Sequence, residues 1–172
     1  MEHLLEIKDL KVEFPSKAGN IHAVNGVNLY VDEGEILGVV GESGCGKTTC
    51  GRTCIGVYDA TGGEVLYDGK DIRKQTKQER KEFTRKVQMI FQDPYSSLDP
   101  RKTVDATIRE PLVVSKRYKK NEIDDVTAEL MELVGIDNRL RMSYPHELDG
   151  GRRQRVGIAR ALALNPDRKS VV

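Results

Sequence analysis

A glycine-rich stretch at residues 41–48, G-E-S-G-C-G-K-T, contains the residue types that hold phosphate groups. It satisfies the pattern G-x-x-x-x-G-K-[ST]. Its glycines let the backbone turn tightly and point successive N–H groups inward, which forms a nest for anionic oxygens. Lys47 supplies a positive charge for the β- and γ-phosphates, and the Thr48 hydroxyl is placed to coordinate Mg²⁺. The predicted phosphate-binding residues are Gly41, Ser43, Gly44, Cys45, Gly46, Lys47, Thr48 and Thr49.

The segments on either side of this loop are those that a phosphate site requires. The apolar run EILGVV at residues 35–40 precedes it and predicts a parallel strand buried on both faces. The segment CGRTCIG follows and predicts a short helix. A strand, a glycine-rich loop and a helix in this order place helix N–H groups against phosphate. The alternative is a chance match in a glycine-rich turn, which the flanking strand and helix argue against.

The first half of the chain is strand-like and the second half is helical. The alternation of apolar and polar residues predicts strands, and DG at residues 68–69 predicts a hairpin turn. Prolines at 94, 100 and 111 predict a region of turns. Strands are expected at 4–14, 21–31 and 87–91, a hairpin at 62–72, and helices at 74–86 and 121–136.

Composition limits the class of protein. The 172 residues suit one domain, and the net charge of +1 gives no whole-chain signal for nucleic acid or an anionic membrane. No apolar run reaches the ~20 residues that span a bilayer, and the N-terminus does not read as a signal peptide, so the cytosol is the expected compartment. Cys50 and Cys54 have too few nearby ligands for a structural zinc site and are expected to be small buried helix residues.

The run KRYKK at residues 116–120 is the strongest local charge feature. Nucleic acid or lipid binding is one interpretation, and a solvated loop or helix face is the other. The second is favoured because the acids of NEIDD follow immediately and balance the charge.

Three further segments determine which kind of phosphate-binding protein this is. MIFQDP places Gln92 after an apolar strand, SYPHELDGGRRQRVGIARALAL has paired glycines opening an amphipathic helix, and Phe14 lies upstream of the loop. Together they resemble the nucleotide-binding subunits of ABC transporters, in particular those of oligopeptide/dipeptide importers. Segments of that kind are FQDPYSSLDPR at 91–101 and GESGCGKTT at 41–49, and the resemblance covers residues 4–166. It implies an α/β fold, a P-loop NTPase (RecA-like) core with an N-terminal antiparallel β subdomain and a helical subdomain, incomplete at the C-terminus.

The resemblance implies roles for single residues. Phe14 matches the aromatic residue that stacks on adenine, and an ordinary core phenylalanine is the alternative. Gln92 matches the glutamine that reaches Mg²⁺ and the attacking water, and a polar strand end is the alternative. Lys47 and Gln92 are therefore the candidate catalytic residues, and Thr48 and Gln92 the candidate Mg²⁺ ligands.

A second candidate ATP contact is the segment from Leu148 to Arg152. It matches the family signature Leu-Ser-Gly-Gly-Gln, which closes over ATP held by the opposite subunit, and Asp149, Gly150 and Gly151 are its candidate binding residues. Asp149 replaces the usual Ser and remains a competent N-cap. Two like charges ~4 Å apart repel by about 4 kcal/mol at an effective dielectric of 20. Compensation by Arg152 and Arg153 is the hypothesis, and a degenerate signature is its rival.

The resemblance also sets the expected domain organisation. Residues 1–172 form a single truncated nucleotide-binding domain, with a β subdomain plus P-loop core at 1–92, a helical subdomain at 93–165 and a non-matching tail at 167–172. The family continues with a strand ending Asp-Glu, which this chain lacks. We therefore expect the N-terminal part of a longer protein, with very weak hydrolysis and with exposed edges at EILGVV and VQMIF.

The implied function is that of the ATP-binding subunit of an importer for oligopeptides or similar small solutes, with ATP and Mg²⁺ as cofactors. The implied partners are a second ATPase subunit in a head-to-tail dimer, transmembrane permease subunits and, indirectly, an extracytoplasmic solute-binding protein. The implied location is the inner face of the cell membrane, without nucleic acid as a partner. The alternatives are a non-catalytic nucleotide-binding fragment, a nucleic-acid-handling ABC ATPase and, more remotely, a small-molecule P-loop kinase.

Overall fold

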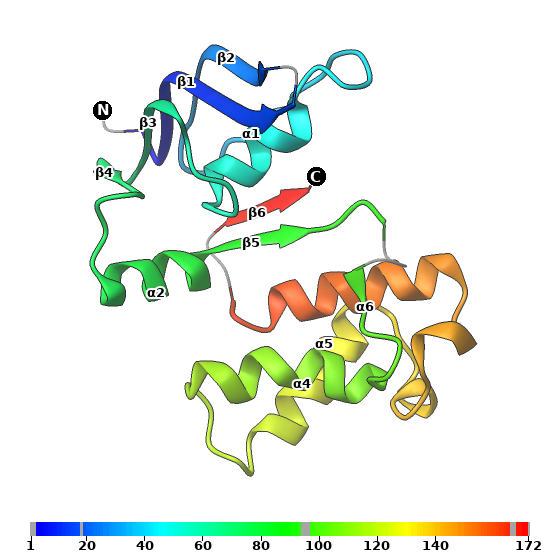
Figure 1. The fold of residues 1–172 in the computed structure, drawn as a ribbon. Helices are drawn as coiled ribbons and strands as arrows, with labels where there is room; N and C mark the ends of the chain where they lie inside the picture. The colour runs from blue at the N-terminus through cyan, green and yellow to red at the C-terminus, as the bar shows by residue number, and fades with distance from the viewer. Residues whose placement is uncertain (1–2, 18, 94–96, 166–167, 172) are drawn as a thin grey trace. The chain divides into compact units, whose positions relative to one another are not determined.

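The computed structural model describes residues 3–17, 19–93, 97–165 and 168–171. The chain divides into two compact units, residues 1–83 and 84–172. Figure 1 shows the helices and strands along the chain.

The first unit is built on a four-stranded antiparallel sheet with the strand order β2-β1-β3-β4. The long strands β1 and β2 pair from Leu5↔Val31 to Ser16↔Gly19. β3 and β4 form the predicted hairpin, and Asp68 and Gly69 both have the positive φ, 52° and 70°, that its turn requires. The strands are β1 (Leu5–Ser16), β2 (Gly19–Val31), β3 (Gly62–Tyr67) and β4 (Lys70–Asp71). The expected antiparallel β subdomain is confirmed.

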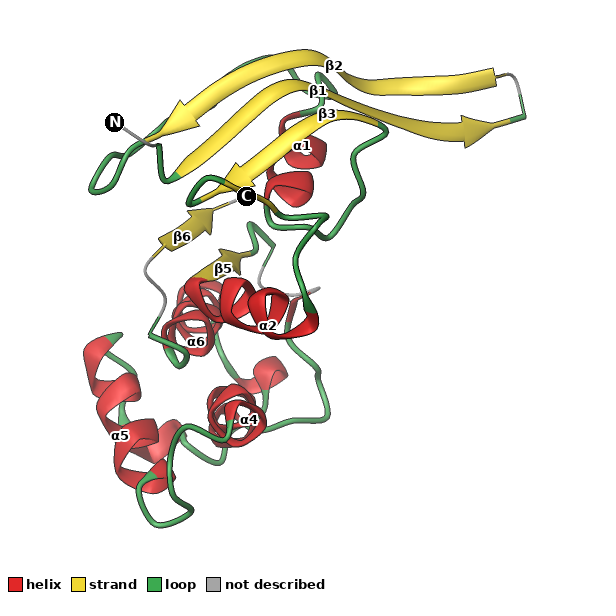
Figure 2. Cartoon of the chain, turned by 90° about the vertical axis from the view of Figure 1, so that its left-hand side faces the viewer, coloured by secondary structure: helices red, strands yellow, loops and turns green. Residues whose placement is uncertain are grey.

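Buried apolar side chains of this sheet form the core of the first unit. Ile7, Leu10, Val12 and Val65 are each at most 1% exposed. Helix α1 (Lys47–Cys54) lies against β1 and β2, as Figure 2 shows. Because the sheet is fixed by its own core, it provides a rigid surface for the loop that precedes α1.

Residues 35–40 differ from their prediction. No strand forms there, and Ile36 and Val40 are 96% and 93% exposed. The physical reason is that a strand requires a hydrogen-bonded partner, and no described strand pairs with this segment. The prediction of a buried parallel strand was therefore wrong for this chain, although its apolar residues have the composition of one.

The second unit contains a parallel strand pair and a helical cluster. β5 (Val87–Ile90) pairs in parallel with β6 (Arg168–Val171), so one edge of VQMIF is paired, and the other edge has no strand partner among the described residues. Residues 168–171 of the expected tail thus form a strand, and residues 167 and 172 lie outside the described residues. The helices are α2 (Lys77–Lys86), which reaches this unit from the first, α4 (Val104–Ser115), α5 (Ile123–Leu133) and α6 (Gly150–Leu162), with single turns η1 (Asn138–Leu140) and η2 (Pro145–Glu147).

Helices α4, α5 and α6 enclose one hydrophobic core. Its fully buried members include Ile108 and Leu112 of α4, Met131 of α5, and Val156 and Ala159 of α6. The helix predicted at 121–136 is confirmed as α5, with bounds two to three residues shorter at each end. None of the described helices combines the length and the apolarity needed to cross a membrane.

Helix α4 was not predicted, because Pro111 was interpreted as part of a region of turns. The helix continues through Pro111, with Val104, Ile108 and Leu112 buried on one face. A proline inside a helix costs about 3 kcal/mol, whereas each of these three side chains contributes about 1.5–3 kcal/mol by burial. Packing therefore outweighs the lost hydrogen bond. Pro94, which was assigned to the same region of turns, lies outside the described residues.

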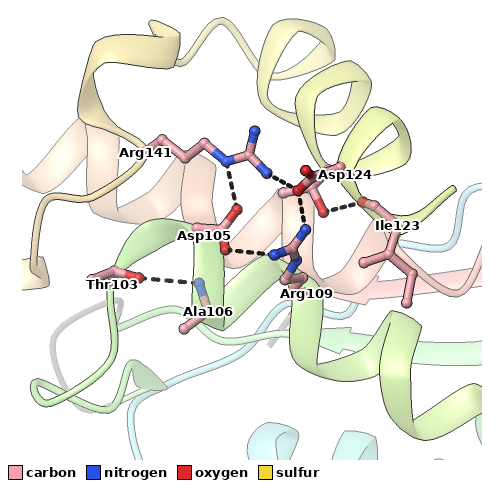
Figure 3. Close-up of polar contacts among 8 residues, drawn as sticks. Thr103, Asp105, Ala106, Arg109, Ile123, Asp124 and Arg141 are labelled. Atoms are coloured by element: carbon pink, nitrogen blue, oxygen red, sulfur yellow. Dashed lines mark hydrogen bonds and ion pairs between the residues drawn. The ribbon is translucent and has the colours of Figure 1, made fainter. Parts of the chain in front are cut away.

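An ion-pair network joins the starts of α4 and α5 to the segment after η1 (Figure 3). Arg141 contacts Asp105 through Nε and Asp124 through Nη2, both at 2.6 Å. Arg109 also pairs with both carboxylates. The backbone N–H of Asp105 donates to the carbonyl of Arg141 at 2.9 Å. The network therefore fixes the chain as it enters the signature segment.

Candidate nucleotide-binding site

The phosphate loop passes into α1 at position 46, which only glycine can occupy. Gly46 is the N-cap of α1 and has the left-handed φ of 92°. A Cβ added to it would lie 2.2 Å from the carbonyl oxygen of Ala23. Both the conformation and the close approach therefore exclude a side chain here.

The carbonyl that approaches Gly46 comes from a β-bulge. Val12 pairs with Val24 and Glu13 with His22, so Ala23 has no partner in β1. Bulges turn the backbone locally and are common beside functional sites. The bulge at Ala23 thus places β2 against the phosphate loop. Sequence reasoning did not find it, because the alternating pattern of β2 carries no mark of the extra residue.

Lys47 bonds to its own loop. Its Nζ donates to the carbonyl oxygens of Gly41 at 2.8 Å and Glu42 at 2.6 Å, and lies 3.6 Å from Sγ of Cys45. Carbonyl oxygens are neutral acceptors, and anionic phosphate oxygens form stronger, charge-assisted bonds with an ammonium group. The ammonium group is therefore held at the loop by acceptors that phosphate can displace.

The first turn of α1 supplies the remaining elements of an anion site. It contains no acidic residue, and its first N–H groups have no acceptor within the helix. Ser43 and Thr48 are exposed, and neither hydroxyl has a hydrogen-bond partner among the described residues. The residues present thus fit a nucleotide phosphate chain, with the Thr48 hydroxyl available to a cation that accompanies it.

The two cysteines of α1 pack against each other. Cys50 is buried, and the hydrogen bond from Cys54 lowers the pKa of Cys50 to about 7 while that of Cys54 is raised. Within the described part of the chain, no group of three or more His, Cys, Asp and Glu side chains could hold a metal ion. These thiols are packing residues of the helix.

Phe14 lies on the same hairpin as the bulge. It pairs with Ile21, two residues along β2 from Ala23, and its half-buried ring meets the Tyr58 ring edge-on at 5.4 Å. Arg52 of α1 donates to the Tyr58 hydroxyl at 2.8 Å. Tyr58 and Arg52 were not singled out from the sequence, yet they connect Phe14 to the helix that begins with Lys47. The placement suits a ring that stacks on a base beside the phosphates.

A cavity of about 260 Å³ in the first unit shares Tyr58 with this site. It lies at the C-terminal end of α1, where its lining includes Thr53, Tyr58 and Arg80. The phosphate loop is at the opposite end of the helix. The candidate nucleotide site is formed by the exposed loop, the start of α1 and the hairpin.

Gln92 belongs to the second unit, where it is exposed and follows β5 by two residues. Arg160 of α6 contacts the chain on both sides of it. The guanidinium lies 5.9 Å from the ring centre of Phe91, and its Nη1 donates to the carbonyl of Ser97 at 2.6 Å. Burial lowers the pKa of Arg160. Arg160 was missed from the sequence, where it is one of several arginines in an amphipathic helix.

The signature segment forms the start of α6. Oδ1 of Asp149 accepts from the backbone N–H of Arg152 at 2.8 Å, and Oδ2 lies 3.3 Å from Nε of Arg152. The bond from the Arg152 N–H lowers the pKa of Asp149. A Cβ at Gly150 would meet nothing within 4 Å, so the first turn is open on that side. The arrangement has the Asp149–Arg152 contact that charge compensation requires.

Comparison with known proteins shows what the chain is similar to. Residues 24–168 match the sequence profile of the ABC transporter family. Two similar curated relatives are oligopeptide transport ATP-binding proteins of Bacillus subtilis (strain 168). AppF is 45% identical over 96% of this chain and 53% of its own length, and OppF is 49% identical over 96% and 55%. The chain thus spans about half the length of these relatives.

Solved structures confirm the expected fold. The ATP-binding cassette MJ0796, in a dimeric post-hydrolysis state bound to ADP and Pi, is 29% identical and superimposes with a TM-score of 0.87. That alignment covers 97% of this chain and 72% of MJ0796. cbiO1 of Clostridium perfringens, at 24% identity and a TM-score of 0.79 over 99% of this chain and 65% of its own, has the same fold.

Proposed function

The chain belongs to the ABC transporter family, and on that premise we propose that it acts in the ATP-binding subunit of an importer for oligopeptides. The observation that carries this proposal is the phosphate loop, in which Lys47 is held by displaceable carbonyl oxygens at the start of α1. The 45% and 49% identity to two oligopeptide transport ATP-binding proteins supports the choice of oligopeptides.

Within this proposal, ATP binds with its phosphates on residues 41–49 and its base against Phe14. Thr48 and Gln92 are the proposed Mg²⁺ ligands, and Lys47 and Gln92 the proposed catalytic residues. Asp149, Gly150 and Gly151 contact the ATP of a second subunit in a head-to-tail dimer, with Arg152 offsetting the Asp149 charge. The exposed first turn of α6 and the 3.3 Å Asp149–Arg152 contact support this role.

The proposed partners are permease subunits in the membrane and, through them, an extracytoplasmic solute-binding protein. The proposed location is therefore the inner face of the cell membrane. The proposed subdomains are residues 1–92 and 93–165. The proposed activity of the whole subunit is ATP hydrolysis coupled to peptide uptake.

Titration with a fluorescent ATP analogue tests the binding step. Lys47→Ala should weaken the affinity about 10–100-fold, because hydrogen bonds to charged groups contribute about 1.5–3 kcal/mol. Lys81→Ala is the matched control, since Lys81 is an exposed lysine of α2 without a partner among the described residues. Equal affinity of the two variants would contradict the assignment of the loop.

Peptide uptake tests the transport step. In cells whose own copy of the gene is disrupted, the intact gene should restore uptake of oligopeptides and the Lys47→Ala gene should not. Restored uptake of a different solute class would overturn the choice of oligopeptides. ATP binding without turnover or uptake would favour a non-catalytic nucleotide-binding protein.

A further inference from the structure

The connection between α4 and α5 is both basic and apolar. Residues 113–122, V-V-S-K-R-Y-K-K-N-E, are called the basic tip here. Val113 and Val114 are 55% and 70% exposed at the end of α4. The tip contains four cations and one carboxylate, that of Glu122. Such a combination is unusual for a surface that contacts only water, because the valines gain nothing from exposure.

The tip is held in one conformation by groups other than its cations. Lys116 ends α4 with a left-handed φ of 54°, and its N–H donates to the carbonyl of Val113 at 3.3 Å. The carbonyl of Ser115 accepts from Nη2 of Arg85 at 2.7 Å. Tyr118 packs against the hydrophobic core of the second unit. The conformation of the tip therefore needs no ion pair.

The four cations of the tip have no carboxylate partner within the part of the chain that the structure describes. Their side chains are exposed and form no ion pair with any residue that the structure describes; they are Lys116, Arg117, Lys119 and Lys120. The structure shows the solvated loop that the sequence predicted. It does not show the acids of NEIDD paired with the four cations.

Those acids are engaged elsewhere or lie beyond the tip. The carboxylate of Glu122 accepts from the backbone N–H of Lys119 at 2.8 Å. Asp124 belongs to the network with Arg109 and Arg141 (Figure 3). Asp125 is exposed in the first turn of α5. The tip thus presents a positive potential beside exposed apolar side chains.

We propose that the basic tip binds the anionic phospholipid headgroups of a bilayer surface. Clustered Lys and Arg are attracted to anionic headgroups, and neighbouring apolar side chains gain free energy at the boundary between headgroups and acyl chains. A nucleic-acid backbone would use the four cations but leave the valines exposed. This inference concerns the tip alone and does not depend on the proposed transport function.

Co-sedimentation of the chain with lipid vesicles tests the inference. At low salt the chain should bind vesicles of phosphatidylcholine with about one third phosphatidylglycerol, and bind pure phosphatidylcholine far more weakly. The triple variant Arg117→Gln, Lys119→Gln and Lys120→Gln should lower the partition coefficient on the anionic vesicles about 100-fold, since each cation near the surface contributes about fivefold. Val113→Ala with Val114→Ala should lower it several-fold.

A second triple variant separates the tip from net charge. Lys17, Lys77 and Lys81 are exposed in the first unit and without partners among the described residues, so changing all three to Gln removes the same charge elsewhere. This control should retain most of the binding to anionic vesicles. An equal loss in both triple variants would overturn the inference, as would binding of the tip to DNA or to a polyglutamate peptide but not to vesicles.

Two further measurements test whether the variants change only vesicle binding. Thermal unfolding of both triple variants should match the parent chain, because the side chains that they change form no ion pair or hydrogen bond with a residue that the structure describes. Affinity for the fluorescent ATP analogue should also be unchanged. Loss of vesicle binding by the triple variant of the tip, with intact ATP binding, would support the tip as a membrane contact. Loss of ATP binding by Lys47→Ala, with intact vesicle binding, would concern only the nucleotide site.

Discussion

Two helices of the chain, α1 and α6, begin with glycine-rich sequence, but their N-termini are capped differently. α1 is capped by Gly46, which has no side chain to accept a hydrogen bond. α6 is capped by Asp149, whose carboxylate accepts from the N–H of Arg152. Because a helix N-terminus carries partial positive charge, it attracts an anion. The first turn of α1 contains no carboxylate, whereas the start of α6 has the carboxylate of Asp149. The capping residue, more than glycine content, distinguishes the two sites.

The same substitution at the two helix starts tests this comparison most strongly. Gly46→Ala should lower the free energy of unfolding by more than about 2 kcal/mol, because it combines a left-handed residue with a backbone overlap. It should also abolish binding of the fluorescent ATP analogue. Gly150→Ala should leave stability equal or raise it by up to about 1 kcal/mol, since the position is open and alanine favours a helix. Urea denaturation measures both changes.

For each of the two variants, one result would contradict the comparison. A tolerated Gly46→Ala with normal nucleotide affinity would show that the contact with Ala23 does not shape the loop. A destabilising Gly150→Ala would show that the start of α6 is packed, which its open surroundings do not predict.

Removal of one cation from each unit should give the next largest effect. Lys47→Met should weaken nucleotide binding about 10–100-fold with little change in stability, because the loop carbonyls it leaves are open to water. Arg160→Met should instead lower the free energy of unfolding by about 1–3 kcal/mol, since it removes the charge-assisted hydrogen bond from Arg160 to the Ser97 carbonyl.

Chemical denaturation and ATP-analogue titration separate these two cations. Arg160→Lys is the matched variant, because it keeps the charge and loses the planar guanidinium that lies over Phe91. If Lys47→Met destabilised the chain as much as Arg160→Met, the distinction between a displaceable and a fixed cation would be wrong.

The smallest effect concerns the carboxylate cap of α6. At neutral pH, Asp149→Ala should lower Tm by roughly 1–4 °C. The pKa of Asp149 is lowered in the folded chain, so its contribution is present above the ordinary value of 3.8 and is lost as the pH falls through the folded value. The gap in Tm should therefore narrow below about pH 4.

Calorimetry from pH 7 to pH 3 measures the narrowing. Asp149→Asn serves as the control, because asparagine caps a helix about as well without a charge that titrates. A gap between Asp149→Ala and the parent chain that stays constant over this range would contradict the role of the ionised carboxylate.

Much of the fold and the phosphate loop could be predicted from the sequence, because both depend on local patterns. The alternation in β1 and β2, the Asp68-Gly69 turn and the apolar spacing of α5 all match the structure. The positions of Lys47 and Thr48 at the start of a helix follow from the motif itself. Each of these features is determined by residues close together in the chain.

The features that the sequence did not predict depend on contacts between residues far apart in the chain. EILGVV has the composition of a strand, but composition does not supply the partner that a strand requires. Pro111 reads as a helix breaker, yet burial of Ile108 and Leu112 outweighs it. Tyr58 beside Phe14, and Arg160 between Phe91 and Ser97, become recognisable only when the chain is folded.

At the β-bulge, substitution of Ala23 and deletion of Ala23 should have different effects on the phosphate loop. Ala23 serves the phosphate loop through its backbone carbonyl, so several small side chains could replace it without changing that contact. Deletion of Ala23 would instead remove this carbonyl together with the register shift between Val12 and Glu13. We therefore expect insertions and deletions among relatives to be excluded at Ala23.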